Sequence, residues 1–443
     1  MSRGKLIAIL LPVVLLAGAF PLLLRGRAEE PEKPEYVADL NSAIVNEDLP
    51  ELRALDHSVD SFMTFWSLKG ASLAIVRNDS LLYAKGYGYA DASTPMAPGT
   101  IMRLASVSKL LTAVGIMKLQ EEGKVFMDTP VFGPLGVLNK YDPYIKDQNY
   151  YLITVEHLLR HQAGFTVRVG RDVMFSTLNF MRDWGLSEPP TPDFLVQKQV
   201  ARRLLFVPGT SQEYSNFGYF LLSLIIEEVS GMPYADYMQE HVFAPAGCSG
   251  FRIGGNYLAD RLPGESQYFM QPDAELVPSF DGKYSAVDKC YGGNDITGLQ
   301  GAGAWVGSAV ELARLVSCID GRDPLEDILS PESVRQMTAY YDDDTFGLGW
   351  VDCKPDGEWT RTGSFSGTSA LVKVYPDGEC WVFITNTSAW RGSRFTKNTA
   401  YLCKKLRSRF SAVMPRRDLF VAGGSSAAGD APAARNAPAA GRD

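Results

Sequence analysis

The pattern of apolar and polar positions begins with an unbroken apolar run from Leu6 to Leu24, with two basic residues close to each end. Nineteen apolar residues are just enough to span a bilayer as a helix. The only small-x-small site nearby, Gly26-Arg27-Ala28, is a poor cleavage site, which favours an uncleaved anchor over a cleaved signal peptide. Residues 1–27 are therefore expected to form a membrane anchor or signal segment. The acidic, proline-bearing stretch 28–50 is expected to be a linker.

The next segments predict a helix, a hairpin and a second helix. Apolar residues recur at helical spacing from Leu52 to Phe65. Two apolar runs then flank the turn-forming residues 78–80, which predicts a β-hairpin. From Ser106 to Glu122 the sequence is apolar on most helical faces and is followed by Gly123, so we expect a buried central helix closed by a glycine cap.

Strand-like segments return near the end of the chain. Residues 126–300 are rich in helical patterns, with the clearest from Leu221 to Val229. After Gly301 come the strand-like runs FGLGWVDC, EWTRTG, TSALVKVYP and CWVFITN, and then a helical pattern from Phe395 to Phe410. This order predicts an α/β (α+β) fold in which the N- and C-terminal segments share one antiparallel sheet flanked by helices, with a mostly helical central subdomain at about 126–300. The catalytic domain is expected over 51–412, and the low-complexity stretch 413–443 is expected to be disordered.

Composition and charge exclude several classes of protein. The net charge is −8 and no basic stripe occurs, so nucleic acid is not an expected partner. The six cysteines are far apart without a C-x-x-C pair, which favours buried free thiols, although an oxidising compartment would allow disulfides. His157 and His161 lie four residues apart but have no evident third ligand, so we expect structural histidines, no metal and no cofactor.

Candidate chemistry begins with Ser106 and Lys109. Neither G-x-S-x-G nor H-E-x-x-H occurs, but residues 106–109 read S-V-S-K. On a helix, residues three apart share a face, so the lysine amine can reach the serine hydroxyl, which needs a nearby base to become a nucleophile. The pattern alone is weak, because residues 2–5 also fit it. The structural alternative is that Ser106 only caps the buried helix.

Several segments together resemble a known family. The segment from AIVRNDSLLYAKGYGYAD to IMRLASVSKLLTAVGIMKLQEEGKV is followed, in order, by ITVEHLLRHQAGF, VPGTSQEYSNFGYFLL, TFGLGW and WTRTGSFSGTSALV. Over roughly residues 55–405 the chain is similar to the penicillin-binding-protein and class C β-lactamase-like family of serine hydrolases. The resemblance implies a β-lactamase/transpeptidase-like fold.

The resemblance also implies roles for the first two motifs. Ser106 corresponds to the nucleophile and Lys109 to its proton-relay partner. Tyr214 of the Y-S-N triplet corresponds to a general base, and Asn216 to the residue that orients the lysine and the substrate amide. A phenol with a pKa near 10 becomes a useful base only if adjacent cations favour its anion. The alternative is that Tyr214 is a buried core tyrosine.

The third motif departs from the family's usual Lys or His before Thr-Gly, because it reads Arg361-Thr362-Gly363. Arginine stays protonated and cannot shuttle protons, but it can help to keep a phenolate anionic and grip a substrate carboxylate. Thr362 is expected to bind substrate, and Gly363 lets substrate lie along the strand edge. The resemblance implies an oxyanion hole made by the backbone N–H groups of Ser106 and Ser364.

The expected function is hydrolysis through an acyl-enzyme on Ser106. The bond cleaved is an amide or ester, in a peptidoglycan-type D-Ala peptide, a β-lactam or a small ester. No E-x-x-L-N glutamate occurs, so Tyr214 is expected to activate water. Partners are a small-molecule or peptide substrate, with Arg361 favouring a carboxylate-bearing one, and the membrane through the N-terminal segment on the extracytoplasmic side. The alternative is a weak or inactive penicillin-binding sensor of the same fold.

Overall fold

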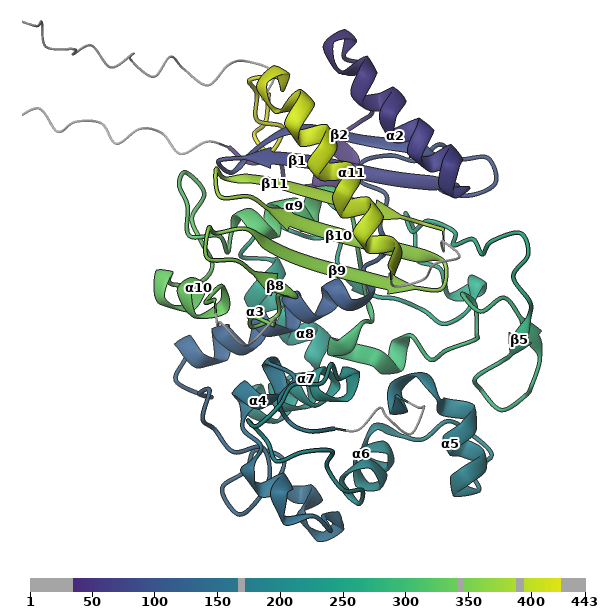
Figure 1. The fold of residues 1–443 in the computed structure, drawn as a ribbon, viewed down its shortest axis with the longest axis vertical. Coiled ribbons are helices and arrows are strands. Elements are labelled where there is room, and N and C mark those ends of the chain that lie inside the picture. Colours follow the sequence, from purple (N-terminus) through teal and green to yellow (C-terminus); the bar gives the residue numbers. More distant parts are fainter. Residues whose placement is uncertain (1–34, 166–171, 341–345, 388–393, 424–443) are drawn as a thin grey trace, which may run out of the picture. The chain divides into compact units, whose positions relative to one another are not determined.

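The computed structural model describes residues 35–165, 172–340, 346–387 and 394–423 (Figure 1). The chain divides into a unit Met1–Glu35 and a unit Tyr36–Asp443, and the fold described below belongs to the second. The predicted anchor or signal segment and most of the predicted tail lie outside the described residues. Within the described ranges, no helix combines the length and the apolar character needed to cross a bilayer.

The main sheet joins the two ends of the domain, as predicted. It is a six-stranded antiparallel sheet in the order β2-β1-β11-β10-β9-β8, in which Ala74 of β1 lies opposite Val382 of β11. The strands are β1 (Gly70–Arg77), β2 (Ser80–Gly88), β8 (Asp352–Cys353), β9 (Trp359–Phe365), β10 (Thr368–Val374) and β11 (Glu379–Thr385).

The predicted hairpin is confirmed. Asn78 and Asp79 connect β1 and β2 with positive φ angles of 45° and 60°, which suits a two-residue turn between twisted strands. The strand predicted for FGLGWVDC is largely wrong, because only Asp352 and Cys353 pair with β9. Gly349 has φ +85°, and a Cβ there would lie 2.7 Å from the Ala113 side chain. This segment is a loop pressed against the central helix.

The sheet separates two layers of helices, because alternate side chains on each strand point to opposite faces. Leu73 and Ile75 of β1 join the core under α2 (Arg53–Trp66) and α11 (Phe395–Phe410). Ala74 and Val76 join the larger core with α3 (Ser108–Glu121) and α9 (Ala309–Ser317). Figure 1 shows α11 crossing the strands, and the observed bounds of α11 match the predicted helix.

The central segment is mostly helical. It contains α4 (Val155–Leu159), α5 (Thr177–Trp184), α6 (Pro192–Val200), α7 (Asn216–Ser230), α8 (Tyr234–Met238) and the π-helix η6 (Gln239–Phe243). Short 3-10 helices are η1 (Pro50–Leu52), η2 (Ala105–Val107), η3 (Asn139–Tyr144), η4 (Gln148–Leu152), η5 (Val173–Phe175), η7 (Leu258–Asp260), η8 (Thr297–Ala302) and η10 (Ser411–Val413). The remaining elements are α1 (Leu40–Ala43), α10 (Pro331–Met337), the small sheet β3 (Met102–Arg103), β7 (Trp305–Gly307) and β4 (Arg252–Ile253), and the pair β5 (Val277–Pro278) and β6 (Ala286–Val287).

The predicted domain boundaries are too narrow at both ends. Tyr36, placed in the linker, forms a β-bridge with Val421, placed in the tail. Leu40 and Phe420 are also buried. Each is an isolated apolar residue in a polar or small-residue stretch, where average composition hides a single well-packed side chain. The six cysteines are all buried and free, as favoured from the sequence.

Candidate active site

Ser106 lies in a tight turn between the small sheet and the central helix. It is the middle residue of η2, and α3 begins two residues later than predicted, at Ser108. No side chain caps the start of either helix, so the capping alternative for Ser106 is wrong. Ala105 has φ +50°, a left-handed conformation that is unusual for alanine. Backbone strain of this kind tends to occur at functional sites.

The three residues of the first two motifs meet around the Ser106 hydroxyl. Its Oγ lies 2.7 Å from the Tyr214 Oη and 3.3 Å from the Lys109 Nζ. The lysine is wholly buried, and its amine also lies 2.7 Å from Asn216 Oδ1 and 2.6 Å from the carbonyl oxygen of Ala302. Three acceptors therefore match the three N–H groups of a protonated amine.

The Y-S-N triplet is positioned by the start of α7. Ser215 is the N-cap of this helix, and its hydroxyl accepts a hydrogen bond from the Gly218 N–H. This cap fixes the direction of the chain, so that Tyr214 on one side of it reaches Ser106 and Asn216 on the other side reaches Lys109. The serine of the triplet is therefore structural, while its neighbours face the reacting group.

The positive charges in the site oppose the effect of burial on the pKa of Tyr214. Burial alone would raise the pKa of Tyr214, but the positive charges of Lys109 and Arg361 outweigh it and hold the pKa below its usual value of 10. Burial also lowers the pKa of Lys109, and the neighbouring Arg361 lowers it further. Both groups are therefore closer to exchanging a proton near neutral pH than either would be in water.

The two histidines are structural, as expected. His161 packs its ring 4.5 Å from that of Tyr214, and its Nδ1 accepts a hydrogen bond from the Ser215 N–H. Burial, with Lys109 and Arg361 nearby, lowers its pKa well below the usual value, so it is neutral. His157 caps α4 through its Nδ1. No group of three or more His, Cys, Asp or Glu side chains is placed to hold a metal within the residues that the structure describes.

Arg361 does not lie where a substrate carboxylate could meet it. Its side chain is wholly buried, and both Nε, at 2.7 Å, and Nη2 donate to the carbonyl oxygen of Ser106. The prediction that it grips a substrate carboxylate is therefore contradicted, because this edge of the guanidinium already binds the main chain of the nucleophile. Its charge still acts on Tyr214, as predicted.

Strand β9 passes directly beside the nucleophile. A Cβ on Gly363 would lie 2.2 Å from the Leu104 carbonyl oxygen and 2.9 Å from the Ser106 nitrogen, so only glycine fits there. The Val351 N–H donates to the Thr360 carbonyl on the β8 side of β9.

Main-chain groups alternate along a strand, so those of Thr362 and Ser364 point to the same side of β9 as those of Thr360. Strand β8 pairs only with Trp359 and Thr360, which leaves this side of residues 362–364 unpaired by β8. The Ser364 N–H is therefore turned toward an open strand edge, as an oxyanion hole would require.

Asp172 belongs to the site but was not predicted. Asn216 donates its amide N–H to the Asp172 carboxylate, which turns the amide oxygen toward Lys109. The same carboxylate accepts a hydrogen bond from the Met174 N–H at the start of η5. A single aspartate outside any motif gives no sequence signal, and neither does the main-chain carbonyl of Ala302.

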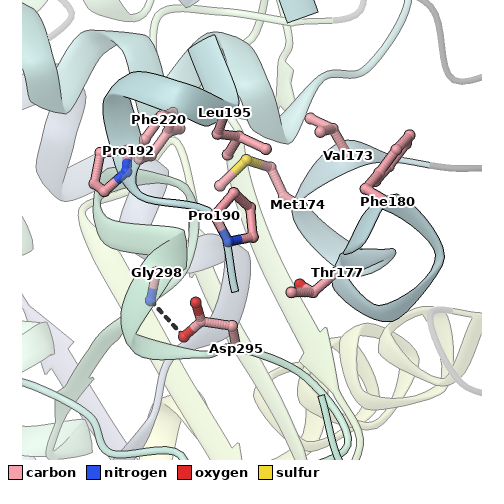
Figure 2. A pocket seen from close by; sticks show the side chains of 10 residues that line it. All are labelled: Val173, Met174, Thr177, Phe180, Pro190, Pro192, Leu195, Phe220, Asp295 and Gly298. Carbon is pink, nitrogen blue, oxygen red and sulfur yellow. Dashed lines mark hydrogen bonds between the residues drawn. The ribbon is translucent and has the colours of Figure 1, made fainter. Parts of the chain in front are cut away.

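A small pocket is lined in part by Val173, the residue that follows Asp172 in the sequence (Figure 2). Its volume is about 70 Å³. Phe220 in its wall lies one helical turn after Asn216 on α7, and Asp295 at its polar side accepts the Gly298 N–H. The lining residues are Val173, Met174, Thr177, Phe180, Pro190, Pro192, Leu195, Phe220, Asp295 and Gly298.

The fold and this arrangement define a class of protein: serine hydrolases of the β-lactamase/transpeptidase-like fold. The model of the Beta-lactamase family matches residues 55–404, and the chain belongs to that family.

Relatives and solved structures agree with this assignment. The chain is 24% identical to PbpX of Bacillus subtilis (strain 168) over 396 residues, which cover 86% of this chain and 89% of PbpX. It is 29% identical to Esterase EstB of Burkholderia gladioli over 47% of this chain and 54% of the esterase. The fold is similar to that of D-amino acid amidase from Ochrobactrum anthropi SV3, with a TM-score of 0.63 and 20% identity over 82% of this chain and 99% of the amidase.

Proposed function

We propose that this chain hydrolyses amides or esters through an acyl-enzyme formed on Ser106. The observation that carries the proposal is the convergence of Tyr214 Oη and Lys109 Nζ on the Ser106 hydroxyl, at 2.7 and 3.3 Å. The shorter distance allows direct proton transfer, and a small movement of the Lys109 side chain would allow it at the longer distance. The cations that lower the pKa of Tyr214 supply the reason why a phenol could act as a base.

In the proposed acylation step, the Tyr214 phenolate takes the proton of Ser106 as Oγ attacks the carbonyl carbon. The Ser106 and Ser364 N–H groups stabilise the developing oxyanion. The proton then passes to the leaving amine or alcohol. Lys109, held between Asn216 and Ala302, keeps its charge beside the phenol throughout.

Deacylation repeats the same proton transfers with water. Tyr214 removes a proton from water as its oxygen attacks the acyl carbon, and Ser106 recovers its proton as it leaves. Arg361 contributes a fixed charge and holds the Ser106 carbonyl, which leaves the nucleophile's own N–H free to turn toward the oxyanion.

The proposed substrates are D-amino-acid-type amides or peptides, β-lactams and small esters. The relative EstB is named an esterase, and the fold neighbour is named a D-amino acid amidase. The buried position of Arg361 removes the argument for a carboxylate-bearing substrate. We also propose that the chain acts on the extracytoplasmic side, attached through residues 1–27, on the basis of their apolar run.

The decisive experiment is intact-mass detection of the adduct formed with a fluorophosphonate and with a labelled penicillin. The wild type should gain one adduct, and Ser106→Ala should gain none. Ser108→Ala is a matched control, because this second serine of S-V-S-K accepts a hydrogen bond from the Trp305 N–H and has no proposed role in the reaction. Labelling of Ser106→Ala would place the nucleophile elsewhere.

Turnover separates the enzyme from the inactive alternative. Hydrolysis of nitrocefin, p-nitrophenyl esters, D-phenylalanine amide and D-Ala-D-Ala peptides should be measured at steady state. We expect turnover of at least one, abolished in Ser106→Ala. A stable adduct on Ser106 without turnover of any of them would instead identify a penicillin-binding sensor.

A further inference from the structure

The outer helix α11 has a charge opposite to that of the rest of the chain. Its sixteen residues, Phe395–Phe410, contain five lysines and arginines and no acidic residue. Because this helix contributes +5 to a net charge of −8, the remaining residues carry −13. Such a concentration of positive charge on an otherwise acidic protein indicates an anionic partner for this helix.

Most of these cations form no ion pair within the described part of the chain. Arg407 binds Asp377 and Glu379. The other four are exposed, and none of them forms an ion pair with another described residue: Lys397, Lys404, Lys405 and Arg409. Helical spacing places Lys397 and Lys404 opposite the buried residues Leu402 and Leu406, while Lys405 and Arg409 lie toward the side of Leu402. The positive charge of this face is therefore available to a partner.

Two aromatic side chains lie exposed beside these cations. Phe65 of α2 is 78% exposed and Tyr401 of α11 is 70% exposed. They border a groove of about 450 Å³ between the two helices, and no acidic residue lines it. Neither carboxylate of α2 lines the groove: Asp56 is bound by Lys85, and Asp60 is exposed outside the lining.

We propose that this docking face, formed by α2 and α11, binds an anionic lipid surface. Interfacial helices place lysines and arginines at the level of anionic headgroups and aromatic rings at the boundary with the acyl chains. A soluble polyanion would account for the four cations but not for the exposed ring of Phe65. The face thus has both features that a lipid surface recognises.

Docking in this way leaves the candidate active site open. Helix α11 packs on the face of the sheet that carries Leu73 and Leu371. The nucleophile lies with α3, which packs in the core on the other face of the sheet. The inference rests on the surface alone and holds whether or not Ser106 is acylated.

The test places an environment-sensitive fluorophore on the docking face of the full chain. Tyr401→Cys is labelled with a nitrobenzoxadiazole, which reacts selectively because the six native cysteines are buried. Leu135→Cys is the matched control, because Leu135 is 87% exposed and lies in the helical subdomain, far from α11 in the sequence. Both proteins are mixed with phosphatidylcholine vesicles with and without about one-third phosphatidylserine.

We expect a blue shift and a rise in fluorescence at residue 401 with the anionic vesicles only, and no change at residue 135. The signal should fall at 0.5 M salt, because the screening length shortens from about 10 Å at 0.1 M to about 3 Å at 1 M. A label at residue 401 reports this face even if residues 6–24 insert into the bilayer by themselves. No change on either vesicle, or an equal change on both, would overturn the proposal.

Charge-removal variants test the cause. Each cation near an anionic surface strengthens binding roughly fivefold, so replacing Lys397, Lys404, Lys405 and Arg409 by glutamine should weaken docking by at least about a hundredfold. The matched control replaces four exposed lysines elsewhere, Lys124, Lys140, Lys146 and Lys283, and should keep the signal. Equal loss in both sets, or an equal response of residue 401 to soluble polyphosphate, would contradict a lipid-binding face.

Discussion

Titratable acids are buried both around Ser106 and at the β1–β2 turn, but their pKa values are shifted in opposite directions. Around Ser106, the phenol of Tyr214 has a lowered pKa. At the β1–β2 turn, Asp79 is buried beside two acidic residues of the loop that follows α9, and its carboxylate accepts the Leu325 N–H. There burial raises the pKa of Asp79 to about 6, of Asp320 to about 8 and of Asp327 to about 6.

The sign of the neighbouring charges explains the difference. Burial disfavours the charged form of every acid in both groups. Next to Tyr214, the cations Lys109 and Arg361 overcome this cost. Next to Asp320, the other two carboxylates add to it, and the nearby Arg322 offsets it only in part. The first group therefore lowers the pKa of an acid that burial alone would raise, and the second raises the pKa of its acids above their values in water.

The largest effect should follow from removing the phenol whose pKa the cations lower. Tyr214→Phe should lower kcat by about a thousandfold, since a positioned general base contributes roughly 10² to 10⁴. Tyr219→Phe is the matched control: this buried tyrosine is near Lys109, but its hydroxyl binds the Leu159 carbonyl. Steady-state kinetics on the best substrate would measure both. Equal losses in the two variants would show that packing, and not proton transfer, explains the role of Tyr214.

Changing the fixed charge should have the next largest effect. Arg361→Gln removes a cation that lowers the pKa of Tyr214, so the acid limb of the pH profile of kcat/KM should move to higher pH by about one unit, and activity on that limb should fall by about tenfold. Arg361→Lys keeps the charge but cannot bind the Ser106 carbonyl with two donors, so its limb should stay near that of the wild type while its plateau falls.

The two variants therefore separate electrostatics from positioning. The measurement is the pH profile of kcat/KM for both proteins. Identical limbs in Arg361→Gln and the wild type would mean that the guanidinium does not act on the phenol.

The sequence predicts some parts of this fold better than others. Local patterns were reliable: the hairpin turn at Asn78 and Asp79, and the helix Phe395–Phe410, follow from period and turn chemistry. The prediction of a strand at FGLGW was wrong. Leu348 and Trp350 are buried apolar residues of a loop that packs in the core, and they do not pair with another strand. Burial produces the same sequence signal in either case.

The candidate site shows the same limit. S-x-x-K and Y-S-N are compact motifs, so their residues could be named in advance. Asp172 is a lone acid, and the Ala302 carbonyl carries no residue-type signal. The charge of Arg361 was expected to act on Tyr214. The sequence could not show that the guanidinium also donates hydrogen bonds to the Ser106 carbonyl oxygen. Contacts made through the main chain or across long separations appear only in the folded structure.

The acidic group should change stability and not catalysis. Asp320 has a pKa raised to about 8 in the folded state against about 4 when unfolded, so the native state keeps a proton that the unfolded state has lost. Its contribution is complete below pH 4 and is lost as the pH rises toward 8, by at most about 1.4 kcal/mol per pH unit. Asp320→Asn should therefore flatten this decline and unfold at higher urea concentration at pH 8.

Urea titrations at pH 5 and pH 8 measure the effect on Asp320. The matched control is Asp236→Asn, an exposed acid on α8 and outside the acidic group, which should leave the wild-type slope unchanged. A decline of unchanged steepness in Asp320→Asn would assign the pH dependence to other groups, with Asp79 and Asp327 tested next.

The smallest effect is expected at Asp172, a carboxylate that adds negative charge beside Lys109. Asp172→Asn keeps a hydrogen-bonding group next to Asn216 but removes that charge, so the limb of the Tyr214–Lys109 pair should move to lower pH, opposite to the shift in Arg361→Gln. We expect kcat/KM to fall about fivefold, because the Asn216 amide loses the charged acceptor that orients it. A shift toward higher pH would mean that Asp172 acts by holding η5 in place and not by its charge.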